Sequence, residues 1–92
     1  MSTSFDSKVR VPEDVLVAQL DGESVLLNVK SAYYFGLDEV GTRIWDLLVS
    51  SESIQRAYES GLAEFDVEPD SFRTDMAELL DSLVGQGLLE VS

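Results

Sequence analysis

Cysteine and histidine are both absent from the 92 residues of this chain. Without cysteine there can be no disulfide and no thiolate metal site, a composition that fits a cytosolic protein. Without histidine the chain lacks the commonest general base and the commonest zinc ligand. Carboxylates and two lysines are left as candidate catalytic groups. We therefore predict a protein that is not an enzyme and that needs no metal or cofactor.

Long hydrophobic runs are also missing. No stretch approaches the roughly 18 apolar residues that a membrane-spanning helix needs, and the first residues lack the apolar core of a secretion signal. With 45% hydrophobic residues, the chain can still build one globular domain with a modest core. We expect a single cytoplasmic domain over residues 1–92, in which the polar residues 1–8 are disordered.

Basic residues are scarce, and their shortage is uneven. The net charge is −12, and thirteen of the 18 acidic residues but only three of the six basic residues fall in residues 38–92. Such a surface repels phosphate backbones and attracts basic partners. It is also the ordinary solvated surface of a soluble protein, which is the simpler interpretation for most of these carboxylates.

Three strands are predicted before any helix. Residues 15–20 and 25–29 are rich in β-formers, and Asp21-Gly22 between them is a strong hairpin turn signal. After a turn at Lys30-Ser31, residues 32–35 form a third strand. Short connections of this kind predict an antiparallel sheet. The residues expected on one face of the return strand are Val25, Leu27 and Val29.

Three helices are predicted after the strands. Asp38 is a good N-cap for a helix over about residues 39–49, and apolar residues at helical spacing continue over 54–65. Pro69 suits the first turn of a third helix, which Gly85 ends. The apolar face of that third helix is Phe72, Met76, Leu79 and Leu83. The predicted fold class is α+β and winged helix-turn-helix-like, with a three-stranded antiparallel sheet followed by three helices.

A winged helix raises nucleic-acid binding as a first functional hypothesis. The third helix would be the reading helix, and Arg73 is its only basic residue. A DNA reader needs several residues that neutralise phosphates. A regulatory winged-helix protein that binds nucleic acid or a basic protein therefore remains the alternative rather than the main prediction.

Two further motifs are weaker. Asp81-Ser82-Leu83 has the form of the attachment site of acyl carrier proteins, but that serine begins a helix in mid-chain, whereas Ser82 lies inside a predicted helix near the end of the sequence. The carboxylates of Asp75, Glu78 and Asp81 are spaced three apart, as in some metal sites. No loop resembles an EF-hand and no histidine completes a site, so a solvated helix face explains them better.

The aromatic third strand is harder to explain by packing alone. In a strand, Tyr33 and Phe35 point to one face and Tyr34 to the other. A core accounts for aromatic residues on one face only, and an open edge strand needs protection or a partner. Addition of an extended peptide to such an edge is a recurrent mode of recognition. The residues leave open whether this strand serves the core alone or the core and a peptide groove.

A series of short motifs runs from about residue 15 to residue 90. The motifs are Asp21-Gly22-Glu23, Val25-Leu26-Leu27-Asn28, Tyr33-Tyr34-Phe35-Gly36-Leu37-Asp38, Gly41, Ile44-Trp45, Leu47-Leu48, Phe65-Asp66-Val67, Pro69, Asp75, Leu83 and Gly87-Leu88-Leu89. In their order and spacing the chain resembles the PqqD-like family, the precursor peptide recognition elements of RiPP pathways. RiPP denotes a ribosomally synthesised and post-translationally modified peptide.

The resemblance implies that the leader of a precursor peptide binds as an added strand, in a cleft between the third strand and the third helix. It implies that Asp75 offers a carboxylate to a basic or hydroxyl group of the leader. It also implies a partner enzyme, such as a leader protease, a cyclase or a radical SAM enzyme. From the acidic helical part and the lack of long apolar runs we expect no nucleic acid and no membrane as a partner. The implied peptide-binding residues are Ala32, Tyr33, Tyr34, Phe35, Phe72, Asp75, Met76, Leu79 and Leu83.

The sequence Tyr33-Tyr34-Phe35-Gly36-Leu37 departs from one branch of this family. Members that serve pyrroloquinoline quinone synthesis tend to lack this aromatic run. The present form is more similar to stand-alone elements of lasso-peptide and other RiPP pathways. The expected pathway is therefore a lasso-peptide or other RiPP pathway.

Overall fold

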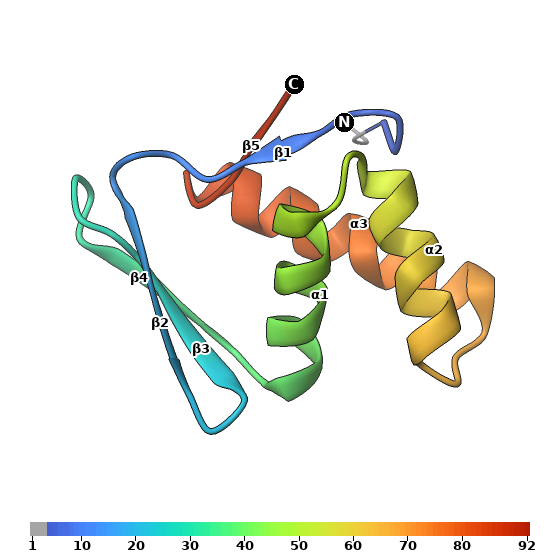
Figure 1. Ribbon diagram of the computed structural model, residues 1–92. Helices are drawn as coiled ribbons and strands as arrows, with labels where there is room; N and C mark the ends of the chain where they lie inside the picture. The colour runs from blue at the N-terminus through green and yellow to red at the C-terminus, as the bar shows by residue number, and fades with distance from the viewer. Residues whose placement is uncertain (1–3) are drawn as a thin grey trace.

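A three-stranded antiparallel sheet and three helices dominate the computed structural model, which describes residues 4–92 (Figure 1). The elements are β1 (Val9–Arg10), β2 (Val15–Leu20), β3 (Glu23–Asn28), β4 (Tyr33–Leu37), α1 (Glu39–Ser50), α2 (Ile54–Glu64), α3 (Pro69–Gly85) and β5 (Glu90–Val91). The strand order is β2-β3-β4, and the helices follow it in sequence. This arrangement confirms the predicted α+β fold class.

Local turn chemistry sets the register of the sheet. Asp21 and Gly22 have φ values of 54° and 82°, as a two-residue hairpin turn requires. The side-chain oxygen of Asn28 accepts hydrogen bonds from the backbone N–H groups of Lys30 and Ser31, at 3.0 and 3.1 Å. Ala32 has a φ of 60° and belongs to this turn. The third strand therefore begins one residue later than predicted and extends to Leu37.

Only one face of the sheet is packed against the helices. Leu26, which is fully buried, lies opposite the half-buried Phe35, and the buried Ser24 lies opposite the buried Leu37. We call the opposite side the outer face. Val25 and Leu27 do share a side of β3, as strand alternation predicts, but that side is the outer face, and Val25 is exposed. The side chains that make up the outer face are Leu16, Ala18, Leu20, Glu23, Val25, Leu27 and Tyr34, with the charged Glu23 opposite Leu20 at the hairpin end.

Side-chain caps fix where each helix begins. The Asp38 carboxylate accepts from the backbone N–H of Gly41 at 2.8 Å, and the Ser53 hydroxyl accepts from that of Arg56 at 3.1 Å. At the start of α3, the Glu68 carboxylate accepts from the backbone N–H of Ser71 at 2.7 Å. This hydrogen bond holds the pKa of Glu68 below its usual value. The predicted cap at Asp38 is confirmed.

Replacing Asp38 with alanine is expected to lower the free energy of unfolding by about 1 kcal/mol. The change removes the acceptor of the Gly41 N–H and leaves the first turn of α1 without its cap. Chemical denaturation measures the difference. Asp38→Asn keeps an acceptor at the same position and should recover most of the loss, so equal losses in both variants would contradict a capping role.

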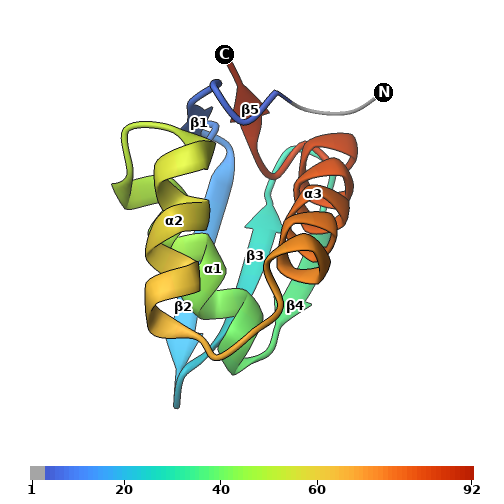
Figure 2. The same cartoon turned by 90° about the vertical axis from the view of Figure 1, so that its right-hand side faces the viewer.

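The core lies between the inner face of the sheet and the three helices. The side chains of Trp45, Leu48, Met76 and Leu80 are almost completely buried in it. In Figure 2, α3 stands on the β4 side of the sheet, whereas α1 and α2 stand toward β2. The Ser24 and Thr42 hydroxyls form a buried 2.7 Å hydrogen bond that ties β3 to α1.

Residues 1–8 were expected to be disordered, but residues 4–8 are packed against the fold. Residues 1–3 lie outside the described residues. Phe5 is buried, its ring packs edge-on against Tyr58 at 5.9 Å, and the guanidinium of Arg73 lies 3.9 Å from its centroid. The backbone carbonyl groups of Phe5 and Ser7 accept from the first N–H groups of α2. One aromatic residue in a polar stretch is thus enough to anchor this segment.

The small β1–β5 pairing brings the two ends of the described chain together. Val9 pairs with Val91 and Arg10 with Glu90, whose side chains also form an ion pair. This pairing was not predicted from the sequence. Within residues 4–92, no helix is long and apolar enough to span a lipid bilayer.

Candidate functional site

Strand β4 is an edge strand, because β3 is its only neighbour among the strands of residues 4–92. In an antiparallel ladder, alternate residues direct their backbone N–H and C=O groups away from the paired strand. The ends of β4 are tied down locally. The Tyr33 N–H donates to the Ser31 hydroxyl at 3.4 Å, and the Leu37 carbonyl accepts from the Thr42 hydroxyl at 3.4 Å. The middle of the strand is the part of this edge available for a further strand.

The three aromatic residues of β4 differ in their surroundings. Phe35 lies opposite the buried Leu26 and packs against the core. Tyr34 lies opposite Leu27 on the outer face, and 70% of it is exposed. Tyr33 is at the start of the strand and is also exposed. Core packing therefore explains Phe35 but not the two exposed tyrosines.

The predicted residues of α3 fall into two groups. Phe72, Met76 and Leu83 belong to the core, and the last two have no exposed surface. Leu79 is half-buried at the margin of the core, and Asp75 is exposed. All of these residues lie on one continuous helix of 17 residues. Because each residue advances the helix by 100°, the accessible side chains lie a fraction of a turn away from the buried ones.

Asp75 and Leu79 lie on the flank of α3 opposite Arg73. A helical rotation of 100° per residue places Asp75 and Arg73 on either side of the buried stripe. Arg73 is held over Phe5, on the side of the N-terminal segment. The helix α3 as a whole stands on the β4 side of the sheet (Figure 2).

The nine predicted site residues therefore do not form one surface. The edge and turn positions, together with Asp75 and Leu79, present accessible atoms. Phe72, Met76 and Leu83 lie beneath them and support the helix from inside. Ala32 is exposed but sits in the turn before the strand.

The polar groups of the described residues form no constellation for metal-based chemistry. Among residues 4–92, no three carboxylates gather in a geometry that could hold a metal ion. An ion pair between Arg43 and Glu64, with 2.7 Å between Nε and Oε2, links α1 to α2 away from β4. The hydrogen bond from Arg43 holds the pKa of Glu64 below its usual value. This pair serves helix packing rather than the candidate site.

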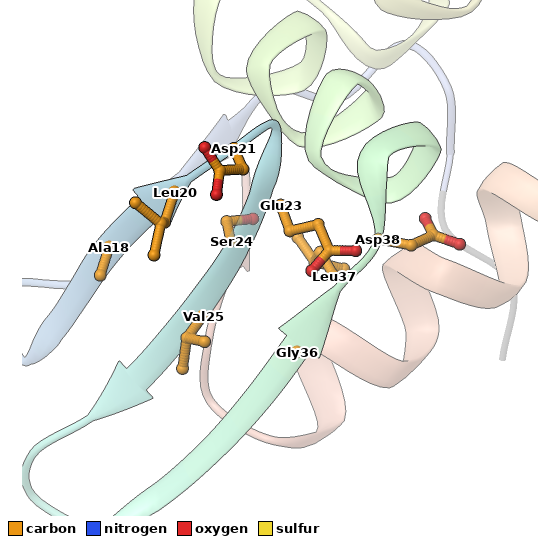
Figure 3. Close-up of a pocket in the computed structure, with 9 residues that line it drawn as sticks. All are labelled: Ala18, Leu20, Asp21, Glu23, Ser24, Val25, Gly36, Leu37 and Asp38. Carbon is orange, nitrogen blue, oxygen red and sulfur yellow. The ribbon is translucent and has the colours of Figure 1, made fainter.

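A hollow on the outer face was not anticipated from the sequence. It has a volume of about 600 Å³ and lies near the tip of the β2–β3 hairpin (Figure 3). Strand β2 is apolar on both of its sides, with Gln19 as its one polar residue, and this is the sequence signal that could have indicated an apolar outer surface. The residues that line the hollow are Ala18, Leu20, Asp21, Glu23, Ser24, Val25, Gly36, Leu37 and Asp38.

Comparison with known proteins gives one family and two similar structures. The family described as coenzyme PQQ synthesis protein D (PqqD) matches residues 23–89. A structure titled "TbiB1 in Complex with the TbiA(beta) Leader Peptide" is 34% identical, with a TM-score of 0.81 over 88% of this chain and 94% of that one. A lasso peptide synthetase B1 complexed with the leader peptide is 28% identical, with a TM-score of 0.80 over 90% of this chain and 98% of that one.

The family match begins at the first residue of β3 and ends after α3, and the two structural matches cover 88% and 90% of the chain. No match was found among curated proteins. The combination of an open aromatic edge strand, an adjacent helix flank and these similar structures is the basis for a functional assignment.

Proposed function

Because the chain belongs to the PqqD family, as a PqqD-like RiPP recognition element, we propose that it binds the leader region of a ribosomally synthesised precursor peptide. The observation that carries this proposal is the unpaired edge of β4. The similar structures, both of which are complexes with a leader peptide, support it. The pathway is a lasso-peptide or other RiPP pathway.

The leader binds by adding a strand to β4. Main-chain hydrogen bonds to the outward groups of Tyr33–Leu37 supply affinity, and side-chain contacts supply specificity. On the strand side the contacts come from Tyr33, Tyr34 and Phe35, with Ala32 at the turn. On the helix side they come from Asp75 and Leu79, which the structure leaves accessible.

The core residues of α3 act indirectly in this proposal. Phe72, Met76 and Leu83 hold α3 at its distance from the sheet. The carboxylate of Asp75 accepts a hydrogen bond or ion pair from a basic or hydroxyl group of the leader. The acidic surface of the helical part favours a basic segment in the leader or in the partner.

The protein acts without catalysis in this proposal, as a single cytoplasmic domain over residues 1–92. It presents the precursor to a maturation enzyme, such as a leader protease, a cyclase or a radical SAM enzyme. Arg73, the only base of α3, is engaged with the ring of Phe5, which supports a peptide rather than a nucleic acid as the ligand.

A proline scan of the leader tests strand addition. Proline lacks the backbone N–H, so it removes a ladder hydrogen bond wherever that N–H points to β4. We expect about tenfold weaker binding, or about 1.4 kcal/mol, at every second position of the bound segment. Fluorescence anisotropy with a labelled leader measures the affinity.

An alanine scan of the same leader positions is the matched control, because alanine keeps the amide. Positions that are sensitive to proline but not to alanine report backbone pairing. An unchanged affinity across the whole proline scan would exclude strand addition. No binding of any precursor leader would exclude the proposed function itself.

A further inference from the structure

The outer face of the sheet is apolar in register across its three strands. Leu16 pairs with Leu27, which in turn pairs with Tyr34, so one row of side chains crosses β2, β3 and β4. Ala18, Val25 and Gly36 form the next row. Large apolar residues of this face are well exposed, 77% for Leu20 and 46% for Val25. A contiguous exposed apolar surface of this kind is typical of a protein contact site.

The apolar outer face also contains the hollow near the hairpin tip. Figure 3 shows Ala18, Leu20 and Val25 around it, with Asp21 and Glu23 at the hairpin tip. Gly36 contributes to the lining, and a Cβ built on it would meet no atom within 4 Å. A depression of about 600 Å³ can receive one or two large apolar side chains of a partner.

Strand β2 also lacks the usual protection of an edge strand. Its sequence, Val15–Leu20, contains no charged residue and no proline. In the part of the chain that the structure describes, β3 is its only neighbour in the sheet. Natural edge strands are normally blunted by charges, prolines or a covering element. The unprotected strand lies at the border of the same apolar face, so both features point to a surface that is covered in an assembly.

The charges around this face decide between two occupants. In an antiparallel pairing of all of β2 (Val15–Leu20) with that of a second copy, Asp14 of one copy would meet Asp21 of the other. Both ends of the pair would then carry like charges, in addition to the net charge of −12 on each chain. A partner with an apolar centre and a basic rim meets no such repulsion.

We propose that the outer face is the docking surface for the maturation enzyme, through a patch on that enzyme that is apolar at its centre and basic at its rim. This inference rests on the proposed function. It places the enzyme on the outer face of the sheet and the leader at the β4 edge. Both can then be held at once, because the two surfaces share only Tyr34, Gly36 and Leu37 of β4.

Lysine substitutions on the outer face test the docking surface. Each maturation enzyme encoded with the precursor peptide is purified and titrated against the full chain, and a labelled leader is titrated in parallel. Val25→Lys and the more exposed Leu20→Lys are expected to weaken enzyme binding at least tenfold, because each places an ammonium in the apolar contact. Leader affinity should stay within twofold of wild type.

Val67→Lys is the matched control. Val67 lies in the loop between α2 and α3, is 43% exposed, and gives the same change of charge. It should leave enzyme binding unchanged. Equal weakening by Val25→Lys and Val67→Lys, or no weakening by either outer-face variant, would overturn the docking proposal.

The parallel titrations keep the two proposals separate. Wild-type protein that binds its leader but none of the enzymes would overturn docking and leave leader capture intact. Failure to bind any leader would overturn the proposed function first. Sedimentation equilibrium adds the remaining outcome, since a dimer of twice 10.2 kDa that Val25→Lys dissociates would assign the face to a second copy and overturn the proposal.

Discussion

Replacing Met76 with alanine is expected to lower the free energy of unfolding by about 2–5 kcal/mol, because it opens a cavity under α3. The Met76 side chain has no exposed surface and lies among the fully buried residues of the core. Its effect on leader affinity should be small at a temperature where the variant is still folded. Urea denaturation gives the stability, and anisotropy with a labelled leader gives the affinity.

Tyr34→Ala is the complementary substitution on the other side of the candidate site. Tyr34 is 70% exposed, so its loss should change the free energy of unfolding by less than about 1 kcal/mol. Under the proposed function it should weaken leader binding several-fold. A Met76→Ala variant that melts like wild type would contradict the core assignment, and equal stability losses in the two variants would contradict the exposure of Tyr34.

Two residues of the third helix show which part of the candidate site can be predicted from the sequence. Met76 and Leu79 occur on the same apolar face of the third helix, and from their spacing alone both are equally good candidates for the core. The structure separates them, because Met76 points into the core and Leu79 lies at its margin. Helical periodicity locates an apolar face but not its border, and that border depends on how far the sheet extends beside the helix.

Local signals predicted the elements themselves. The Asp21-Gly22 turn and the cap at Asp38 act within a few residues of chain, and the structure has both. The packing of Phe5 and the pairing of Val9 with Val91 depend on residues more than 50 positions away, for which a single sequence carries no pattern.

The sequence also did not predict which side of β3 faces the core. The strand is apolar on both sides, since Leu26 alternates with Val25 and Leu27. Alternation assigns residues to sides but does not say which side is covered. Here the inner side includes the polar Ser24. Its burial is tolerated because its hydroxyl is hydrogen-bonded to the Thr42 hydroxyl at 2.7 Å. The apolar outer side is the surface from which docking of an enzyme was inferred.

Adding a side chain at Gly61 should disrupt the fold more than any surface change. A Cβ on Gly61 would lie 2.6 Å from Cζ and 2.7 Å from Cε2 of Phe72. The ring of Phe72 cannot easily yield, because it stacks on Tyr58 at 5.8 Å and packs against Phe65 at 5.9 Å. We expect Gly61→Leu to cost about 3 kcal/mol or more, the upper end of overpacking penalties, as measured by chemical denaturation.

Gly85→Ala is the matched helical control, since a Cβ there meets no atom within 4 Å. It should be neutral or stabilise α3 by less than about 1 kcal/mol. The smaller change Gly61→Ala allows a double-mutant cycle with Phe72→Leu. This second substitution replaces the clashing ring with a smaller side chain. A favourable coupling between the two would show that the clash is with Phe72. Because Phe72 is in the first turn of α3, the same contact sets how close that helix stands to the rest of the fold. Purely additive losses would place the strain elsewhere and remove Gly61 as the residue that fixes the position of α3.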